Sequence, residues 1–204
     1  MGTVTSLPGI DPEVFWAEMS PCEHVVQIYG DDRVFLDGLE GFIGNGLRRG
    51  ESAIAIATAT HLHGLEKRMR QNGVDVDEAR AENRYVPRLA EEVLEEFMVK
   101  DWPDEARFLE SMEALIRQAR GPGHRKVRAF GEMVAILWAR GNHAATIHLE
   151  LLWTKVLQAE KFPLFCAYPR DTFSKNATES IVEICRIHSR VAPPSFRNGT
   201  EGDD

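Results

Sequence analysis

The fold is decided by the stretch HVVQIYGDDRVFLDGLEGFIGNGLRRGESAIAIAT, residues 24–58. Its β-branched start predicts a strand over 24–29. Asp31 is placed to cap a helix over about 32–47, whose apolar residues form one stripe. The continuous run of small apolar residues at 52–58 is typical of a strand buried on both faces. The stretch therefore predicts a strand, a helix and a second strand.

This alternation continues along the chain and sets the fold class. It predicts an α/β fold, a three-layer sandwich with a mainly parallel central sheet and helices on both faces. Residues 1–20 are expected to form an irregular lead-in, 21–191 one folded domain, and 192–204 a disordered acidic tail. Further strands are expected at 84–89, 126–130 and 162–168, and further helices at 60–72, 90–99, 104–120, 132–140, 143–160 and 174–189.

The glycines after the first helix resemble a phosphate-binding loop only in spacing. Leu47 and Arg48 stand where a P-loop needs Lys and Ser or Thr. These glycines also lie at a helix C-terminus, where Gly46 or Gly50 as a C-cap explains them. The strand-to-helix turn that would hold a phosphate contains Asp31, and its charge repels one. We therefore expect no triphosphate site, with residual nucleotide binding through non-standard contacts as an alternative.

Composition limits the classes of function. The 204 residues carry a net charge of −8 and are 43% hydrophobic, which is ordinary for a globular protein. An acidic chain without a basic stripe is not expected to bind nucleic acid directly. No apolar run has the length of a membrane span, and the N-terminal residues lack the basic and apolar pattern of a secretory signal, so we expect none. Three cysteines without a C-x-x-C pattern favour reduced thiols, so we expect a cytoplasmic protein.

No catalytic or metal-binding motif stands out. His61 and His63 form an H-x-H pair whose side chains point apart on a helix. No His, Cys, Asp or Glu set has a zinc-site spacing, and no serine has a nucleophile-elbow context. We therefore expect no enzymatic activity, no metal and no cofactor.

Several segments resemble the MEDS family, the sensory domain of methanogens and methylotrophs found in the regulator DcmR. They cover nearly the whole folded part. The segments are HVVQIY (24–29), GLRRGE (46–51), RAFGEM (128–133), LWAxGN (137–142), LExLW (149–153), FxLFCAYP (162–169) and ICRIHS (184–189).

The resemblance implies a RecA-like or KaiC-like fold without its ATP-binding loop. It also implies a signal-sensing role in signal transduction or transcriptional regulation, with small organic compounds as inputs. Members are often fused to DNA-binding or histidine-kinase modules. This chain shows neither, so we expect it to act on a separate signalling protein, a kinase or regulator, or by self-association. A ligand-free interaction module is the alternative.

Polar and aromatic residues near the expected strand ends are the candidate ligand-binding residues. Glu132 follows a strand, where it either lines a crevice or stabilises the next helix. Glu150 falls between two apolar stripes of its helix, so burial requires a partner. Arg128 is the predicted partner, in a structural pair or as an anchor in a ligand pocket. The aromatic candidates for that pocket, which could equally be core residues, are Tyr29, Trp138, Trp153 and Tyr168.

Overall fold

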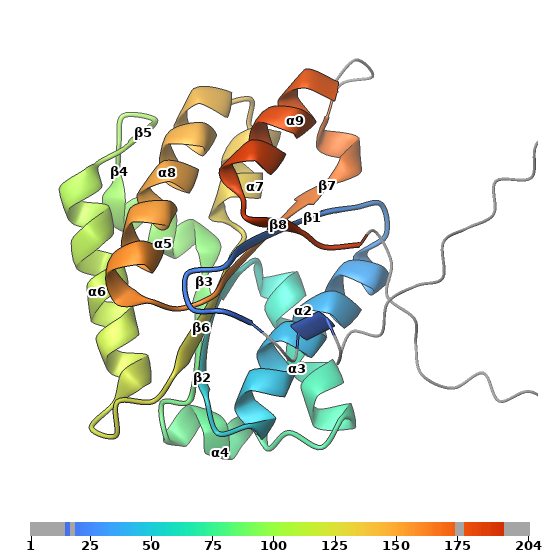
Figure 1. Cartoon of the computed structure of the whole chain (residues 1–204), viewed down its shortest axis with the longest axis vertical. Helices are drawn as coiled ribbons and strands as arrows, with labels where there is room; N and C mark the ends of the chain where they lie inside the picture. The colour runs from blue at the N-terminus through green and yellow to red at the C-terminus, as the bar shows by residue number, and fades with distance from the viewer. Residues whose placement is uncertain (1–14, 17–18, 174–177, 194–204) are drawn as a thin grey trace, which may run out of the picture.

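The computed structural model describes residues 15–16, 19–173 and 178–193. A six-stranded sheet in the order β3-β2-β6-β7-β1-β8 lies between two layers of helices (Figure 1). Every pairing in this sheet is parallel, as expected. Its strands are β1 (His24–Tyr29), β2 (Ser52–Ala57), β3 (Tyr85–Leu89), β6 (Val127–Gly131), β7 (Leu164–Pro169) and β8 (Arg190–Val191).

Each face of the sheet has its own helices. One face, here the α2 face, is covered by α2 (Asp32–Arg48) and α3 (Ala59–Gln71), and α4 (Val76–Ala81) packs beside α3. The opposite face, here the α8 face, is covered by α5 (Ala90–Phe97), α6 (Glu105–Arg120), α7 (Met133–Ala139), α8 (His143–Glu160) and α9 (Thr178–Ile187).

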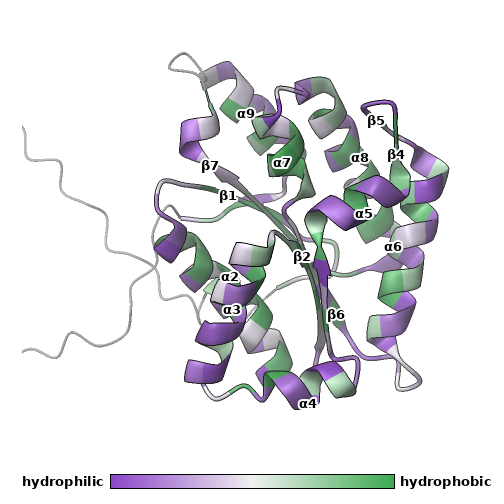
Figure 2. Cartoon of the chain, turned by 180° about the vertical axis from the view of Figure 1, so that it is seen from behind, coloured by the Kyte–Doolittle hydropathy of each residue, from purple (hydrophilic) through white to green (hydrophobic). Residues whose placement is uncertain are grey.

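Strand alternation divides the core into two. Successive side chains of a strand point to opposite faces, so Val25 packs on the α2 face and Val26 on the α8 face. Both are fully buried. Figure 2 shows hydrophobic residues along the central strands and hydrophilic ones on the outer sides of α3 and α5. The buried side chains of the central strands thereby fall into two separate interiors.

The end of α2 explains the glycines that resemble a P-loop. Arg49 caps the helix, and Gly50 follows with φ +77°. The amides of Gly50 and Glu51 bond to the carbonyls of Leu47 and Gly46 at 3.0 and 2.9 Å. This pair of bonds is a Schellman motif, so Gly50 is the residue that ends the helix.

Some elements escaped prediction because they are short. These are α4, strand β8, the 3-10 turn Arg170–Thr172, and a two-stranded antiparallel sheet of β4 (Met98–Val99) and β5 (Trp102–Pro103). In the lead-in, Phe15 and Trp16 are buried on the α2 face. Ala192, in the expected tail, is buried and donates its amide to Val26 O, whereas 194–204 lie outside the described residues.

Within the described ranges, no helix combines the length and the apolar character that crossing a bilayer requires.

Candidate functional site

The carboxyl edge of the sheet has two switch points. After β1 and β2 the chain enters helices of the α2 face, whereas after β6 and β7 it enters helices of the α8 face. β1 lies next to β7, and β2 lies next to β6. In each pair, the chain leaves one strand toward the α2 face and the other strand toward the α8 face. Such switch points are where open α/β sheets bind ligands.

At the switch point between β2 and β6, Glu132 bridges the two diverging connections. Its carboxylate accepts a hydrogen bond from the Thr58 amide at 2.8 Å and contacts Nδ1 of His61 at 2.7 Å. It makes no side-chain bond to the start of its own helix α7, so it stabilises the beginning of α3 instead. Burial lowers the pKa of His61, but the hydrogen bond and charge of Glu132 outweigh it, and the pKa lies above its ordinary value.

The β1–β7 crevice contains a cavity of about 350 Å³. Tyr29 forms one wall, with its ring stacked on Phe35 at 4.6 Å between centroids. Burial, together with the charges of nearby carboxylates, raises the pKa of Tyr29, so its hydroxyl stays protonated and can donate a hydrogen bond. The cavity is lined by Tyr29, Gly30, Asp32, Pro169, Arg170 and Asp171.

Beside this cavity, Asp31 occupies the start of α2. Its Oδ1 accepts a hydrogen bond from the amide of Arg33 at 2.7 Å, and its Oδ2 pairs with the Arg33 guanidinium at 2.9 Å. The guanidinium holds the pKa of Asp31 below its ordinary value. The protein's own carboxylate therefore stands where a helix N-terminus would bind a phosphate.

The predicted pairing of Arg128 with Glu150 is wrong. Arg128 points to the α2 face, where Nε lies 2.5 Å from Oε2 of Glu51 and Nη1 donates to Phe42 O at 3.0 Å. Glu150 lies on the α8 face, so the sheet separates the two side chains. The helix was placed correctly over the sheet, but the side to which Arg128 points depends on strand register, which the sequence leaves open.

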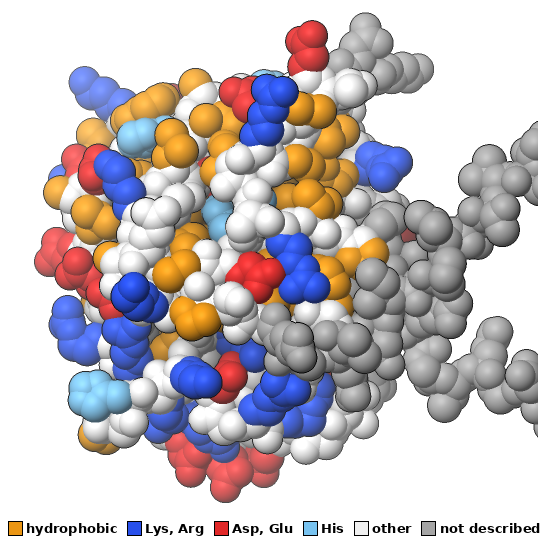
Figure 3. Space-filling model, in the orientation of Figure 1, with side chains coloured by type: hydrophobic (Ala, Val, Ile, Leu, Met, Phe, Trp, Pro, Cys, Tyr) orange, Lys and Arg blue, Asp and Glu red, His pale blue; other side chains and the backbone are white. Residues whose placement is uncertain are grey.

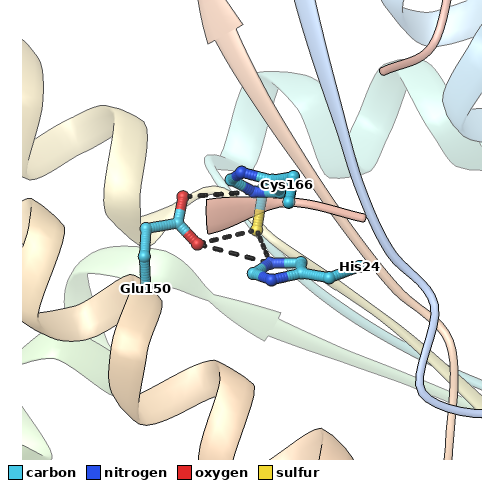
Figure 4. A group of neighbouring side chains, drawn as sticks. His24, Glu150 and Cys166 are labelled. Atoms are coloured by element: carbon cyan, nitrogen blue, oxygen red, sulfur yellow. Dashed lines mark hydrogen bonds and ion pairs between the residues drawn. The ribbon is translucent and has the colours of Figure 1, made fainter. Parts of the chain in front are cut away.

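Glu150 is fully buried in a polar cluster between α8 and the sheet (Figure 4). Its Oε2 lies 3.3 Å from Nε2 of His24 and 3.6 Å from Sγ of Cys166. Its Oε1 accepts a hydrogen bond from the Tyr168 hydroxyl and lies 3.5 Å from Nε2 of His188. His24 Nε2 also lies 3.5 Å from Cys166 Sγ. We call His24, Glu150, Cys166 and His188 the buried cluster.

Burial and neighbouring charges shift the pKa values of Glu150, His188 and Cys166. Burial raises the pKa of a carboxyl group, yet the two imidazoles and the Tyr168 hydroxyl hold that of Glu150 below its ordinary value. Burial lowers the pKa of His188 to about 4, so this ring is neutral at pH 7. Burial and the Glu150 charge both raise the pKa of the Cys166 thiol. A protonated, fully buried thiol is a poor nucleophile, so the cluster does not resemble a catalytic dyad.

The sequence did not single out His24, Cys166 or His188 as site residues. They come from the start of β1, the middle of β7 and the turn after α9. The Ser189 hydroxyl and amide bond to the backbone of His24 and bring His188 beside it. The available signal was that each member of the buried cluster lies in a different segment of the family resemblance.

The predicted aromatic residues do not share one pocket. Tyr29 is on the α2 face, whereas Trp153 is on the α8 face against Phe108. Trp138 stacks on His143 at 4.0 Å and meets the edge of Tyr168 at 6.4 Å. Only Tyr29 among them lines a cavity that the structure describes, and the others are core residues.

A wider groove of about 800 Å³ lies away from both switch points. It runs between α5, the β4–β5 hairpin and the turn from α7 to α8, and it contains none of the predicted site residues. Its walls are Glu91, Leu94, Glu95, Met98, Lys100, Asp101, Leu137, Arg140, Gly141 and Asn142.

Comparison with known proteins identifies the family of the chain and a structure of similar fold. Residues 23–189 match the family described as MEDS, the MEthanogen/methylotroph, DcmR Sensory domain. A crystal structure of a KaiC-like protein from Pyrococcus horikoshii OT3 is similar in fold, with a TM-score of 0.56 and 13% identity over 79% of this chain and 68% of that one. No curated protein sequence matches the chain.

Proposed function

The chain belongs to the MEDS family of sensory domains, and from this premise we propose that it is a non-catalytic signal-sensing domain that binds a small organic ligand in the β1–β7 crevice. The observation that carries the proposal is the cavity at this switch point. Its volume of about 350 Å³ lies within the range of small-molecule sites.

The lining of the cavity indicates the class of ligand. Asp32 and Asp171 contribute carboxylates, and Tyr29 contributes a protonated hydroxyl. Arg170 adds one guanidinium, so the two carboxylates leave the lining net negative. This charge disfavours a phosphate and favours a small neutral or cationic molecule with at least one hydrogen-bonding group. The Asp31 carboxylate at the start of α2 also repels a phosphate.

Thermal-shift screening of small alcohols, amines and halogenated compounds tests the proposal. A ligand should raise the melting temperature of the wild type and should do so less in Asp171→Asn and Tyr29→Phe. Asp101→Asn, which changes a carboxylate in the wider groove, is the matched control and should respond like the wild type. A library that stabilises no protein, or stabilises all four equally, contradicts the site.

Titration calorimetry with ATP and magnesium separates sensing from residual nucleotide binding. We expect no heat of binding at millimolar nucleotide, because Asp31 occupies the phosphate position. Saturable heat that is altered in Asp171→Asn would instead favour the nucleotide-binding alternative.

An exposed apolar surface favours a second candidate, a protein-interaction module. Val99, Trp102 and Leu151 are 40%, 47% and 49% exposed, and Trp102 stacks on His148 of α8 at 4.9 Å. In Figure 3, hydrophobic side chains gather in the upper half of the view and charged ones in the lower half. Self-association that is lost in Leu151→Lys supports this role, and a monomer at every concentration removes it.

A further inference from the structure

The two histidines of the buried cluster turn the same nitrogen inward. Nδ1 of His188 lies 2.8 Å from Ile184 O, and a carbonyl only accepts, so Nδ1 carries the proton. Nε2 of His188 is then a bare lone pair, and it has no hydrogen-bond partner among the described residues. Its contact is the carboxylate of Glu150, another acceptor, at 3.5 Å.

His24 is oriented in the same way. The Thr154 hydroxyl donates its one proton to Glu150 O at 3.0 Å, so toward Nδ1 of His24, at 3.5 Å, it can only accept. A proton on Nδ1 of His24 would point to this hydroxyl, and Nε2 faces the carboxylate and Cys166. Metal-binding histidines are held by this arrangement, with one ring N–H on an oxygen of the protein and the other nitrogen toward the metal.

Four contacts among these groups are close to the ligand spacing of a tetrahedral ion. Bonds of about 2.0–2.1 Å to nitrogen or oxygen and about 2.3 Å to sulfur place neighbouring ligand atoms about 3.3–3.6 Å apart. Oε2 of Glu150 lies 3.3 Å from Nε2 of His24 and 3.6 Å from Sγ of Cys166, and its other oxygen, Oε1, lies 3.5 Å from Nε2 of His188. Nε2 of His24 lies 3.5 Å from Sγ of Cys166. All four ligand atoms lie within 4.8 Å of one another.

We propose that His24, Glu150, Cys166 and His188 bind one Zn²⁺ ion between the sheet and helices α8 and α9. Two imidazoles, a thiolate and a carboxylate suit zinc better than magnesium or calcium, which prefer oxygen ligands alone. Binding releases the Cys166 proton to solvent. The cation would lie between the lone pair of His188 Nε2 and the Glu150 carboxylate, two acceptors that otherwise face each other.

The proposed site has a structural character. Four protein ligands leave no open position for substrate, which is typical of structural zinc. The ion would join β1, β7, α8 and the turn after α9, and Tyr168, bonded to Glu150, precedes the Pro169 wall of the crevice. The inference does not depend on any ligand binding in that crevice.

Cobalt substitution tests the site in the full-length protein. Metal-free protein, prepared by unfolding and refolding with a chelator, is titrated anaerobically with Co²⁺. We expect one Co²⁺ per chain, a thiolate-to-cobalt charge-transfer band, tetrahedral d–d bands, and displacement of the cobalt by Zn²⁺.

Variants assign the ligands. Cys166→Ser should lose the charge-transfer band, and His188→Gln should weaken Co²⁺ binding at least tenfold. Cys185→Ser, which changes a partly exposed thiol of α9, is the matched control and should keep both. Wild-type protein that binds neither ion when refolded with it overturns the proposal whether or not the variants fold. So does a charge-transfer band that survives Cys166→Ser.

Discussion

The backbone of Gly46 lies against the side chain of Arg128. A Cβ atom built on Gly46 would lie 2.5 Å from Cδ and 2.6 Å from Nε of Arg128, far inside van der Waals contact. Arg128 is 2% exposed, and Glu51 and Phe42 O hold its guanidinium in place. Gly46, which resembles a P-loop glycine in sequence, makes room for a buried arginine.

This contact predicts that the effect of Gly46→Ala on the free energy of unfolding changes sign when Arg128 is replaced by alanine. Gly46→Ala should destabilise the wild type by about 1–3 kcal/mol, because the new methyl overlaps Arg128. In an Arg128→Ala background the same change should be neutral or stabilising by up to about 1 kcal/mol, because alanine favours a helix over glycine. Urea unfolding of the four proteins measures both effects. Equal destabilisation in the two backgrounds would show that the contact is not the cause.

Glu150→Gln should destabilise the protein by about 3–5 kcal/mol. The substitution removes the charge that His24 and His188 face inside the core. It also leaves one acceptor oxygen where Tyr168 and Cys166 bond to two. Chemical unfolding in the presence of a chelator measures the loss without a contribution from metal. Glu110→Gln, on the exposed side of α6, should change stability by less than about 0.5 kcal/mol. Similar values for the two variants would place Glu150 in solvent.

His61 should make stability depend on pH. Glu132 and Asp32 raise its folded pKa above the unfolded value of about 6.5. Its contribution is therefore fully present below the unfolded pKa and is lost as the pH rises through the folded pKa. The difference in unfolding free energy between wild type and His61→Gln should be larger at pH 5.5 than at pH 8.5.

A second background isolates the cause of that pH dependence. In Glu132→Gln the carboxylate that contacts His61 is gone, so the excess effect at low pH should shrink. If the effect of His61→Gln at low pH is as large in Glu132→Gln as in the wild type, another charge is the cause.

Metal loading should raise thermal stability. At free Zn²⁺ about a hundredfold above its dissociation constant, binding to the folded state alone adds about 2.7 kcal/mol. For a chain of this size the melting temperature should rise by roughly 5–10 °C. Differential scanning calorimetry with zinc and with chelator measures the shift. It should be present in Cys185→Ser and absent in Cys166→Ser, and a shift common to both would come from another site.

Local patterns predicted most of the fold. Apolar periodicity predicts the strands and helices around the sheet, and the position of Asp31 predicts the cap of α2, where its side chain accepts from the Arg33 amide. Such features depend on neighbours a few residues away. Elements of two residues, such as β8, carry too little pattern to be predicted.

The sequence by itself determined the alternating α/β order, the acidic turn at the start of α2 and the membership of one family. Only the tertiary structure decided which side chains meet. Arg128 pairs with Glu51 and not Glu150 because strand register sends it to the other face of the sheet. The buried cluster joins residues from four distant segments, and spacing along the chain cannot reveal it. Periodicity is a short-range property, whereas contact across two layers depends on how the whole chain packs.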